Sequence, residues 1–207
     1  MPRITLIGYR GTGKSTVAAR LATLLGCGAD DADEVLERRV GCSIAALIRD
    51  RGEPAFRDEE SLVLADLLAR CDGVLSTGGG VVLRPVNREL LRGRGRPIVW
   101  LTAPAVVVHG RIAADPATPQ RRPSLAAAGG LPPVDPMTEV TAALAAREPL
   151  YRECADVVID TSVEPPDAVA RRIVAWLAGR EPREERRPVP PPDGPPPSGP
   201  AMEGRTR

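Results

Sequence analysis

The residues Gly8 to Thr16 read Gly-Tyr-Arg-Gly-Thr-Gly-Lys-Ser-Thr and fill every fixed position of the phosphate-binding pattern G-x-x-x-x-G-K-[ST]. In such a loop, backbone N–H groups surround phosphate oxygens and the lysine neutralises their charge. Lys14 is the only lysine of the chain, although Lys and Arg together number 28. A compact ammonium fits between β- and γ-phosphates where a planar guanidinium does not. This pattern therefore predicts a binding site for a nucleoside triphosphate rather than a glycine turn that matches the pattern by chance.

A second group of candidates is the acidic run Asp30, Asp31 and Asp33 at the end of an expected strand. Carboxylates at the C-terminal edge of a parallel sheet, beside a phosphate loop, are well placed for a metal ion and an acceptor hydroxyl. On an extended chain Asp31 and Asp33 point the same way. The same run also fits a helix N-cap, and both interpretations stay open.

Three arginines have candidate roles toward an anionic substrate. Arg57 and Arg147 could form a clamp for a carboxylate, although Arg57 also fits a solvated helix charge and Arg147 a cap on a helix dipole. Arg122, within Arg121-Arg122-Pro123, lies in a segment from 114 to 133 that is rich in Pro, Ala, Gly and Arg. A loop of that length is typical of a lid, from which an arginine can reach a transferring phosphoryl group.

The glycine triplet Gly78, Gly79 and Gly80 follows the apolar residues Val74 and Leu75. Three glycines at a strand end cost backbone entropy unless something must approach closely. We therefore expect backbone N–H groups here to face a bound ligand.

The elements that must position these residues alternate between strands and helices, which predicts an α/β fold with a mostly parallel sheet. The expected strands are 3–7, 28–31, 73–77, 97–102 and 156–160, and the expected helices are 14–25, 33–40, 43–51, 54–70, 85–91, 104–113, 136–147 and 166–178.

The composition indicates one domain, residues 1–178, followed by a disordered proline-rich tail, residues 179–207. A formal net charge of +1 argues against general nucleic-acid or membrane-surface binding. No apolar run has the length of a membrane span and the chain enters a strand almost at once, so we expect a cytoplasmic protein. The four cysteines form no CxxC pair, which favours free thiols over a zinc site. We expect a monomer.

Four blocks together resemble the shikimate kinase family: GYRGTGKST, DDADEVLERRVGCSIAALIRDRGEPAFRDEE, VLSTGGG, and RRPSL followed by AAREPLYRECADVVID. The resemblance spans about residues 4 to 178. It implies a three-layer α/β/α P-loop kinase fold with a five-stranded parallel sheet, substrate-binding helices and a lid at about 114–133. It also implies phosphoryl transfer from ATP, with Mg²⁺, to the 3-hydroxyl of shikimate.

By resemblance, the phosphate-loop residues Gly11, Thr12, Gly13, Lys14, Ser15 and Thr16 bind ATP, with Arg111 near the adenine and Arg122 as the lid arginine. Ser15 holds the metal, which Asp31 and Ser76 reach through water. The shikimate site comprises Asp33 as the base, Arg57 and Arg147 on the carboxylate, and Gly79 and Gly80 in the pocket wall. The catalytic group is then Lys14, Asp33 and Arg122.

Two alternatives stay open. A gluconate-kinase-like or other small-molecule kinase of the same fold would carry a different substrate pocket. A non-catalytic nucleotide-binding regulator would use the proline-rich tail to recruit a partner. The loop 161–164 lacks the basic residue that some family members place against adenine.

Overall fold

This computed structural model describes residues 1–115 and 135–179. Its strands form one sheet in the order β2-β3-β1-β4-β5, and all of them run parallel. The five strands within those ranges are β1 (Ile4–Ile7), β2 (Ala29–Asp31), β3 (Val74–Ser76), β4 (Ile98–Thr102) and β5 (Val157–Asp160). The expected strands are confirmed, and no strand end is shifted by more than one residue. The strand β1 is central, and all of its residues are buried, as its mostly apolar sequence predicts.

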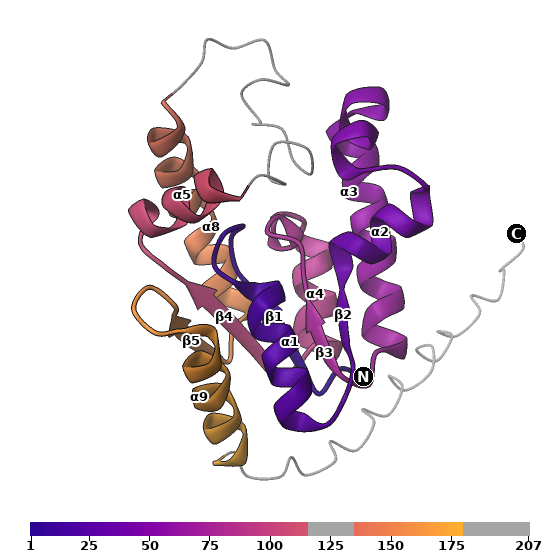
Figure 1. The fold of residues 1–207 in the computed structure, drawn as a ribbon. Coiled ribbons are helices and arrows are strands. Elements are labelled where there is room, and N and C mark those ends of the chain that lie inside the picture. The colour runs from indigo at the N-terminus through magenta and orange to yellow at the C-terminus, as the bar shows by residue number, and fades with distance from the viewer. Residues whose placement is uncertain (116–134, 180–207) are drawn as a thin grey trace, which may run out of the picture.

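Helices cover both faces of the sheet, which confirms the three-layer α/β/α fold (Figure 1). The helices α1 (Lys14–Leu25) and α9 (Pro166–Ala178) pack on one face. The other face carries α3 (Ile44–Arg70), α4 (Pro85–Arg94) and α8 (Pro136–Cys154). The remaining elements are α2 (Ala32–Val40), the 3-10 turn η1 (Val81–Leu83) and α5 (Ala105–Ala114).

The order of the strands places the candidate residues along one edge of the sheet. Because β1, β2 and β3 are parallel and in close register, their C-terminal ends lie side by side. The next strand in sequence after β3 pairs on the opposite side of β1. Such a reversal opens a crevice outside the carboxyl ends of the strands, where ligands bind in α/β sheets.

The helix α3 joins the two predicted helices 43–51 and 54–70 across a break. Gly52 has φ 82° and ψ 163°, so the backbone turns there and starts again at the following proline. Ser43 is the N-cap of the first half, since the backbone N–H of Ala46 donates to Ser43 Oγ at 3.2 Å. The second half of α3 begins beside the edge of the sheet where the candidate residues gather, because its Arg57 lies against Gly80.

The helix α8 is longer than predicted. We expected it to end at Arg147, but it continues to Cys154 although Pro149 removes a backbone N–H within it. Tyr151 and Cys154 are 1% and 0% exposed, and both belong to the larger core cluster. Their burial offsets the lost hydrogen bond, which costs about 3 kcal/mol. Arg147 is therefore in mid-helix, and its interpretation as a helix cap is wrong.

The expected lid, with Arg122, lies almost wholly outside the described residues, and so does the expected tail. No helix within residues 1–115 and 135–179 is long and apolar enough to cross a membrane. The four cysteines are free thiols, of which Cys71 and Cys154 are buried, Cys27 is partly buried and Cys42 is exposed.

Candidate functional site

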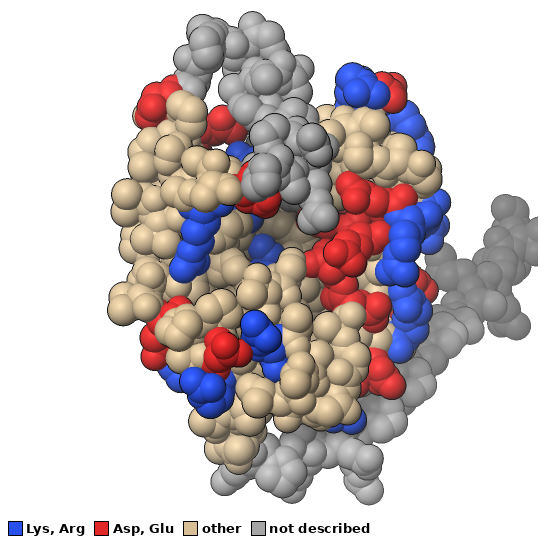
Figure 2. Space-filling model, in the orientation of Figure 1, with Lys and Arg blue, Asp and Glu red and all other residues tan. Residues whose placement is uncertain are grey.

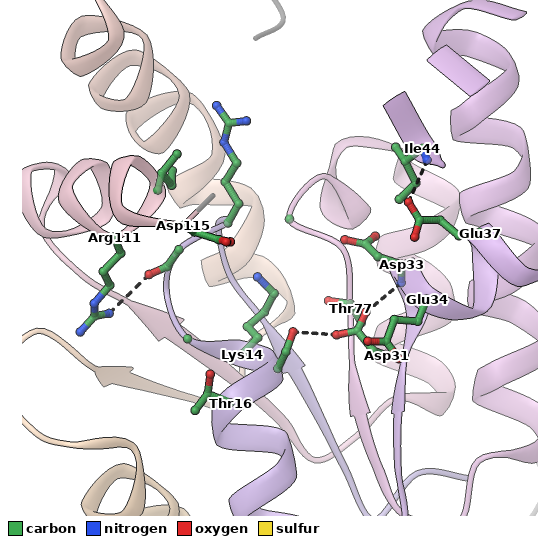
Figure 3. Close-up of a pocket in the computed structure, with 16 residues that line it drawn as sticks. Lys14, Thr16, Asp31, Asp33, Glu34, Glu37, Ile44, Thr77, Arg111 and Asp115 are labelled. Carbon is green, nitrogen blue, oxygen red and sulfur yellow. Dashed lines mark hydrogen bonds between the residues drawn. The ribbon is translucent and has the colours of Figure 1, made fainter. Parts of the chain in front are cut away.

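The loop between β1 and α1 has the form of a phosphate cradle. Gly13, the N-cap of α1, has φ 87°, a left-handed conformation that residues with a side chain rarely adopt. The loop is braced from within, because Thr12 Oγ1 and Lys14 Nζ donate to the carbonyl of Tyr9 at 2.8 and 2.9 Å. Lys14 is only 8% exposed and its ammonium points toward the open space above the loop (Figure 3). The N-terminus of α1 thus faces the same space, as a phosphate group requires.

A cavity of about 410 Å³ opens over this loop. One wall is the phosphate loop with Gly11, Gly13, Lys14, Ser15 and Thr16, and the opposite wall is the start of α2 with its carboxylates. Figure 2 shows acidic side chains gathered on the α2 side of the hollow. The cavity therefore brings a phosphate cradle and a set of carboxylates face to face.

The carboxylate of Asp31 joins two hydroxyls from separate elements. Its Oδ2 accepts hydrogen bonds from Ser15 Oγ at 2.7 Å and from Ser76 Oγ at 3.1 Å. Carboxylate, hydroxyl and water oxygens are the ligands that Mg²⁺ prefers. The residues expected at a metal thus lie together, and their donor set fits a hard divalent cation.

Asp31 also serves as the N-cap of α2, because its Oδ1 accepts from the backbone N–H of Asp33 at 3.0 Å. The N-cap interpretation of the acidic run is therefore confirmed for Asp31, and its role at a metal stays a prediction. The expected extended alternation is wrong, since α2 already begins at Ala32. Asp33 nevertheless lines the cavity, and its carboxylate points into it (Figure 3). The helical turn, rather than strand alternation, directs it there.

The glycine triplet is packed against the protein itself. A Cβ on Gly79 would lie 2.9 Å from the backbone nitrogen of Arg10 in the phosphate loop. A Cβ on Gly80 would lie 2.1 Å from a guanidinium nitrogen of Arg57. The carbonyl of Gly79 is held as well, since it accepts from Arg147 at 3.3 Å and from the Tyr151 hydroxyl. The close approach that three glycines predicted is thus to the protein's own arginines and phosphate loop.

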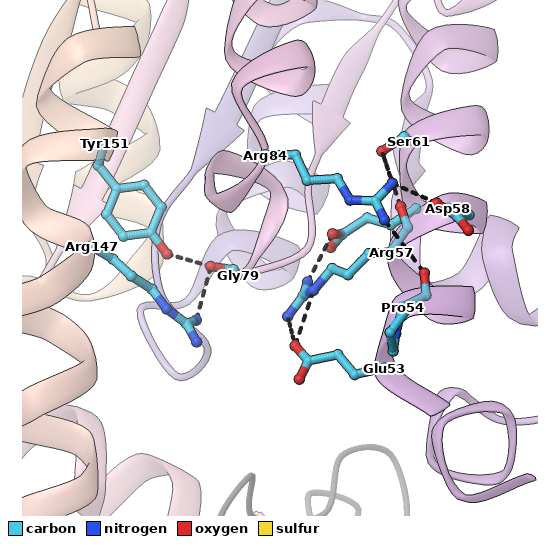
Figure 4. Close-up of polar contacts among 10 residues, drawn as sticks. Glu53, Pro54, Arg57, Asp58, Ser61, Gly79, Arg84, Arg147 and Tyr151 are labelled. Atoms are coloured by element: carbon cyan, nitrogen blue, oxygen red, sulfur yellow. Dashed lines mark hydrogen bonds and ion pairs between the residues drawn. The ribbon is translucent and has the colours of Figure 1, made fainter. Parts of the chain in front are cut away.

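Arg57 is largely buried, with a side chain 11% exposed, so its interpretation as a solvated charge is wrong. Its guanidinium is paired with Glu53 at 2.9 Å and with Glu60 at 2.8 Å. Arg147 is 8% exposed and lies 5.0 Å from the centre of the Tyr9 ring. In Figure 4 the two guanidinium groups point toward the same region from either side of the Gly79 loop. This arrangement provides two arginines for one anion.

Arg111 connects three parts of the site. It donates to the carbonyl and hydroxyl oxygens of Thr161 at 2.6 and 3.0 Å and to the carbonyl of Gly11 at 3.4 Å. Thr161 itself donates to the carbonyl of Thr12 at 3.1 Å. Arg111 thus ties α5 and the end of β5 to the phosphate loop. It also stands beside the loop 161–164, which lacks a basic residue of its own.

Sequence reasoning missed several residues of this site. Tyr9 and Arg10 occupy variable positions of the phosphate-loop pattern, so the pattern said nothing about their side chains. Thr161 carries no motif that would reveal its contact with Arg111. The Tyr151 hydroxyl was detectable, because a buried tyrosine needs a hydrogen-bond partner.

A sequence model of the shikimate kinase family matches residues 10–178. The chain belongs to the shikimate kinase family. The shikimate kinase of Oleidesulfovibrio alaskensis is 44% identical over 178 residues, which cover 86% of this chain and 98% of that protein. The shikimate kinase of Pseudomonas syringae pv. syringae is 41% identical, over 88% of this chain and 100% of that protein.

Solved shikimate kinases have the same fold. The shikimate kinase from Acinetobacter baumannii in complex with shikimate superposes with a TM-score of 0.76 and 35% identity, covering 84% of this chain and 92% of that one. The shikimate kinase from Aquifex aeolicus gives a TM-score of 0.68 and 29% identity, over 86% and 97% of the two chains. The family resemblance and the P-loop kinase fold are thereby confirmed.

Proposed function

We propose that the protein transfers the γ-phosphoryl group of ATP to the 3-hydroxyl of shikimate, a step of aromatic amino acid biosynthesis. The observation that carries this proposal is the pair Arg57 and Arg147, which converge beside the Gly79 loop at the edge of the phosphate cavity. Two buried guanidinium groups suit a carboxylate. Because the chain belongs to the shikimate kinase family, we propose that this carboxylate is that of shikimate.

Phosphoryl transfer requires positioning and charge neutralisation more than covalent chemistry by the protein. Lys14 and the backbone N–H groups of its loop bind the β- and γ-phosphates. Asp33 accepts the proton of the attacking hydroxyl, and its place in the cavity across from Lys14 supports this role. Arg57 and Arg147 orient shikimate through its carboxylate, with Gly79 and Gly80 in the pocket wall.

A divalent cation accompanies ATP in kinases of this kind, and we propose Mg²⁺. Ser15 would bind it directly, and Asp31 and Ser76 would hold its water ligands, since their oxygens already converge. The cation neutralises phosphate charge when it is bound. The described residues contain no group of three or more His, Cys, Asp or Glu side chains that could hold a metal, so phosphate oxygens and water complete its shell.

Three further roles belong to the same proposal. Arg111, which joins Thr161 and Gly11 at the rim of the cavity, borders the adenine. Arg122 acts on the transferring phosphoryl group from the lid. The enzyme works as a cytoplasmic monomer, in which one chain supplies every residue named above.

The deciding experiment is a coupled ADP-release assay of the purified protein with shikimate, gluconate and a nucleoside monophosphate. Turnover of shikimate with a rise of about 10-fold or more in its KM in Arg57→Ala and Arg147→Ala supports the proposal. Turnover of gluconate or of the nucleoside monophosphate, with no turnover of shikimate, would show that shikimate is not the substrate. Asp33→Asn should lower kcat by about 10²- to 10⁴-fold. A wild-type protein that binds ATP and turns over none of the three would be the non-catalytic regulator.

A further inference from the structure

The cavity needs more positive charge than its assigned residues provide. Its lining carries five carboxylates, from Asp31, Asp33, Glu34, Glu37 and Asp115, against three cationic side chains. The two substrates proposed above are both anions. Any cation on this lining with unused hydrogen-bond donors is therefore a candidate ligand for a phosphate or carboxylate group.

Two of the three cations already have several hydrogen bonds or a fixed role. Lys14 donates to the Tyr9 carbonyl at 2.9 Å and belongs to the phosphate loop. Arg111 makes three hydrogen bonds that tie β5 to the loop. Arg10 is different: toward residues 1–115 and 135–179 its only ionic contact is a long one of 3.9 Å to Glu139, at the start of α8.

The donors of Arg10 are enclosed but scarcely used. Its side chain is 24% exposed, and its Nε is buried with no hydrogen-bond partner among the residues described. A guanidinium has five N–H donors, and a buried donor without a partner costs free energy. Arg10 therefore has both the capacity and the reason to bind an oxyanion that enters the cavity.

The position of Arg10 selects which anion that is. The backbone of Arg10 belongs to the phosphate loop. Its backbone nitrogen lies so close to Gly79 that a Cβ added to Gly79 would be 2.9 Å from it. Arg10 thus stands at the junction of the ATP cradle and the wall proposed for the acceptor. The group that passes this junction during the reaction is the γ-phosphoryl group.

We propose that Arg10 is a further phosphoryl-binding residue, which leaves Glu139 and contacts the γ-phosphoryl group as it passes to the acceptor. This inference rests on the proposed function. The bond between the γ-phosphorus and the β,γ-bridging oxygen of ATP breaks, and a bond from that phosphorus to the acceptor oxygen forms. ADP leaves, and Asp33 takes the proton of the acceptor hydroxyl. Arg10 exchanges no atom and stabilises the charge on the oxygens of the moving group.

The test separates this role from a structural ion pair, because Glu139→Gln breaks the same pair and leaves the guanidinium in place. Arg10→Gln should lower kcat about 10- to 100-fold at unchanged thermal stability, and Arg10→Lys should recover part of the loss. Glu139→Gln should keep kcat within about twofold of wild type or raise it. A binding readout uses calorimetry with Mg²⁺ and ADP, with and without beryllium fluoride as a γ-phosphoryl mimic. Arg10→Gln should weaken only the fluoride complex.

Equal losses of kcat and stability in Arg10→Gln and Glu139→Gln would overturn the inference, because the pair would then serve only to hold α8 to the loop. A rise confined to the KM of shikimate in Arg10→Gln would also overturn it, by assigning Arg10 to the acceptor. If the wild-type protein fails to phosphorylate shikimate, the proposed function falls by itself. The beryllium fluoride comparison still decides the role of Arg10 in that case.

Discussion

Gly80→Ala should damage the proposed carboxylate clamp without touching the ATP site. Gly80 has φ −101° and ψ 0°, which alanine tolerates, so the effect comes from the methyl group alone. That methyl carbon would lie 2.1 Å from a terminal nitrogen of Arg57 and 2.7 Å from its Cζ. Ordinary contact begins at 3.4 Å, so the guanidinium must retreat by about 1.3 Å.

The retreat is costly because Arg57 is held on two sides. It donates to Glu53 at 2.9 and 3.2 Å and to Glu60, which is 5% exposed, at 2.8 Å. Losing one hydrogen bond to a charged group costs about 1.5–3 kcal/mol. Each 1.4 kcal/mol changes an equilibrium constant about tenfold. We therefore expect the KM for shikimate to rise about 10- to 100-fold, with the KM for ATP unchanged.

The matched control is Gly93→Ala in α4, where an added Cβ meets nothing within 4 Å. It should leave both KM values unchanged and raise stability by about 0.5–1 kcal/mol. Steady-state kinetics in both substrates, with thermal unfolding of each variant, measures these effects. If folded Gly80→Ala keeps the KM for shikimate within twofold of wild type, the reasoning on Arg57 as a clamp is refuted.

Three other changes test separate parts of the molecule. Lys14→Arg should lower kcat about 100-fold or more, since a planar guanidinium cannot take the position that the compact ammonium holds beside the Tyr9 carbonyl and between the phosphates; a folded variant with a tenth of wild-type activity contradicts this. Burial raises the pKa of the Cys154 thiol to about 11, so this thiol stays protonated at pH 8. Iodoacetamide should therefore label the exposed Cys42 far faster than Cys154, and peptide mass spectrometry measures the two rates. Deleting 180–207 should leave kcat and both KM values within about twofold; an inactive but folded truncation argues for a functional tail.

Local sequence signals predicted most of the fold because each element carries its own. The phosphate-loop glycines, the N-cap at Ser43 and the apolar run of β1 act over a few residues. The predicted end of α8 was wrong because the true end depends on tertiary burial. Pro149 gives a local reason to stop, but the buried Tyr151 outweighs it. No local pattern reports how much burial a distant part of the chain supplies.

The candidate site was predictable as a set of residues, but not as a set of contacts. The spacing of Glu53, Arg57 and Glu60 would have revealed the ion pairs on one helix face, since residues three and four apart meet there. Arg10 could not be predicted, because its pattern position accepts any residue. The reason for Gly80 was equally hidden, since Arg57 lies far from it in sequence and the two meet only in the folded chain.

The surroundings of Arg57 explain why the proposed clamp needs a second arginine. Glu53 and Glu60 both pair with Arg57, so these three side chains carry a formal charge of −1 before any substrate binds. A carboxylate approaching Arg57 alone would meet two others and be repelled. Arg147 has only neutral partners in the described residues, the Gly79 carbonyl and the Tyr9 ring. Arg147 therefore supplies the positive charge that makes binding of the shikimate carboxylate favourable. Arg57, which is held in place by its two glutamates, orients that carboxylate. On this argument Arg147→Ala should raise the KM for shikimate more than Arg57→Ala does.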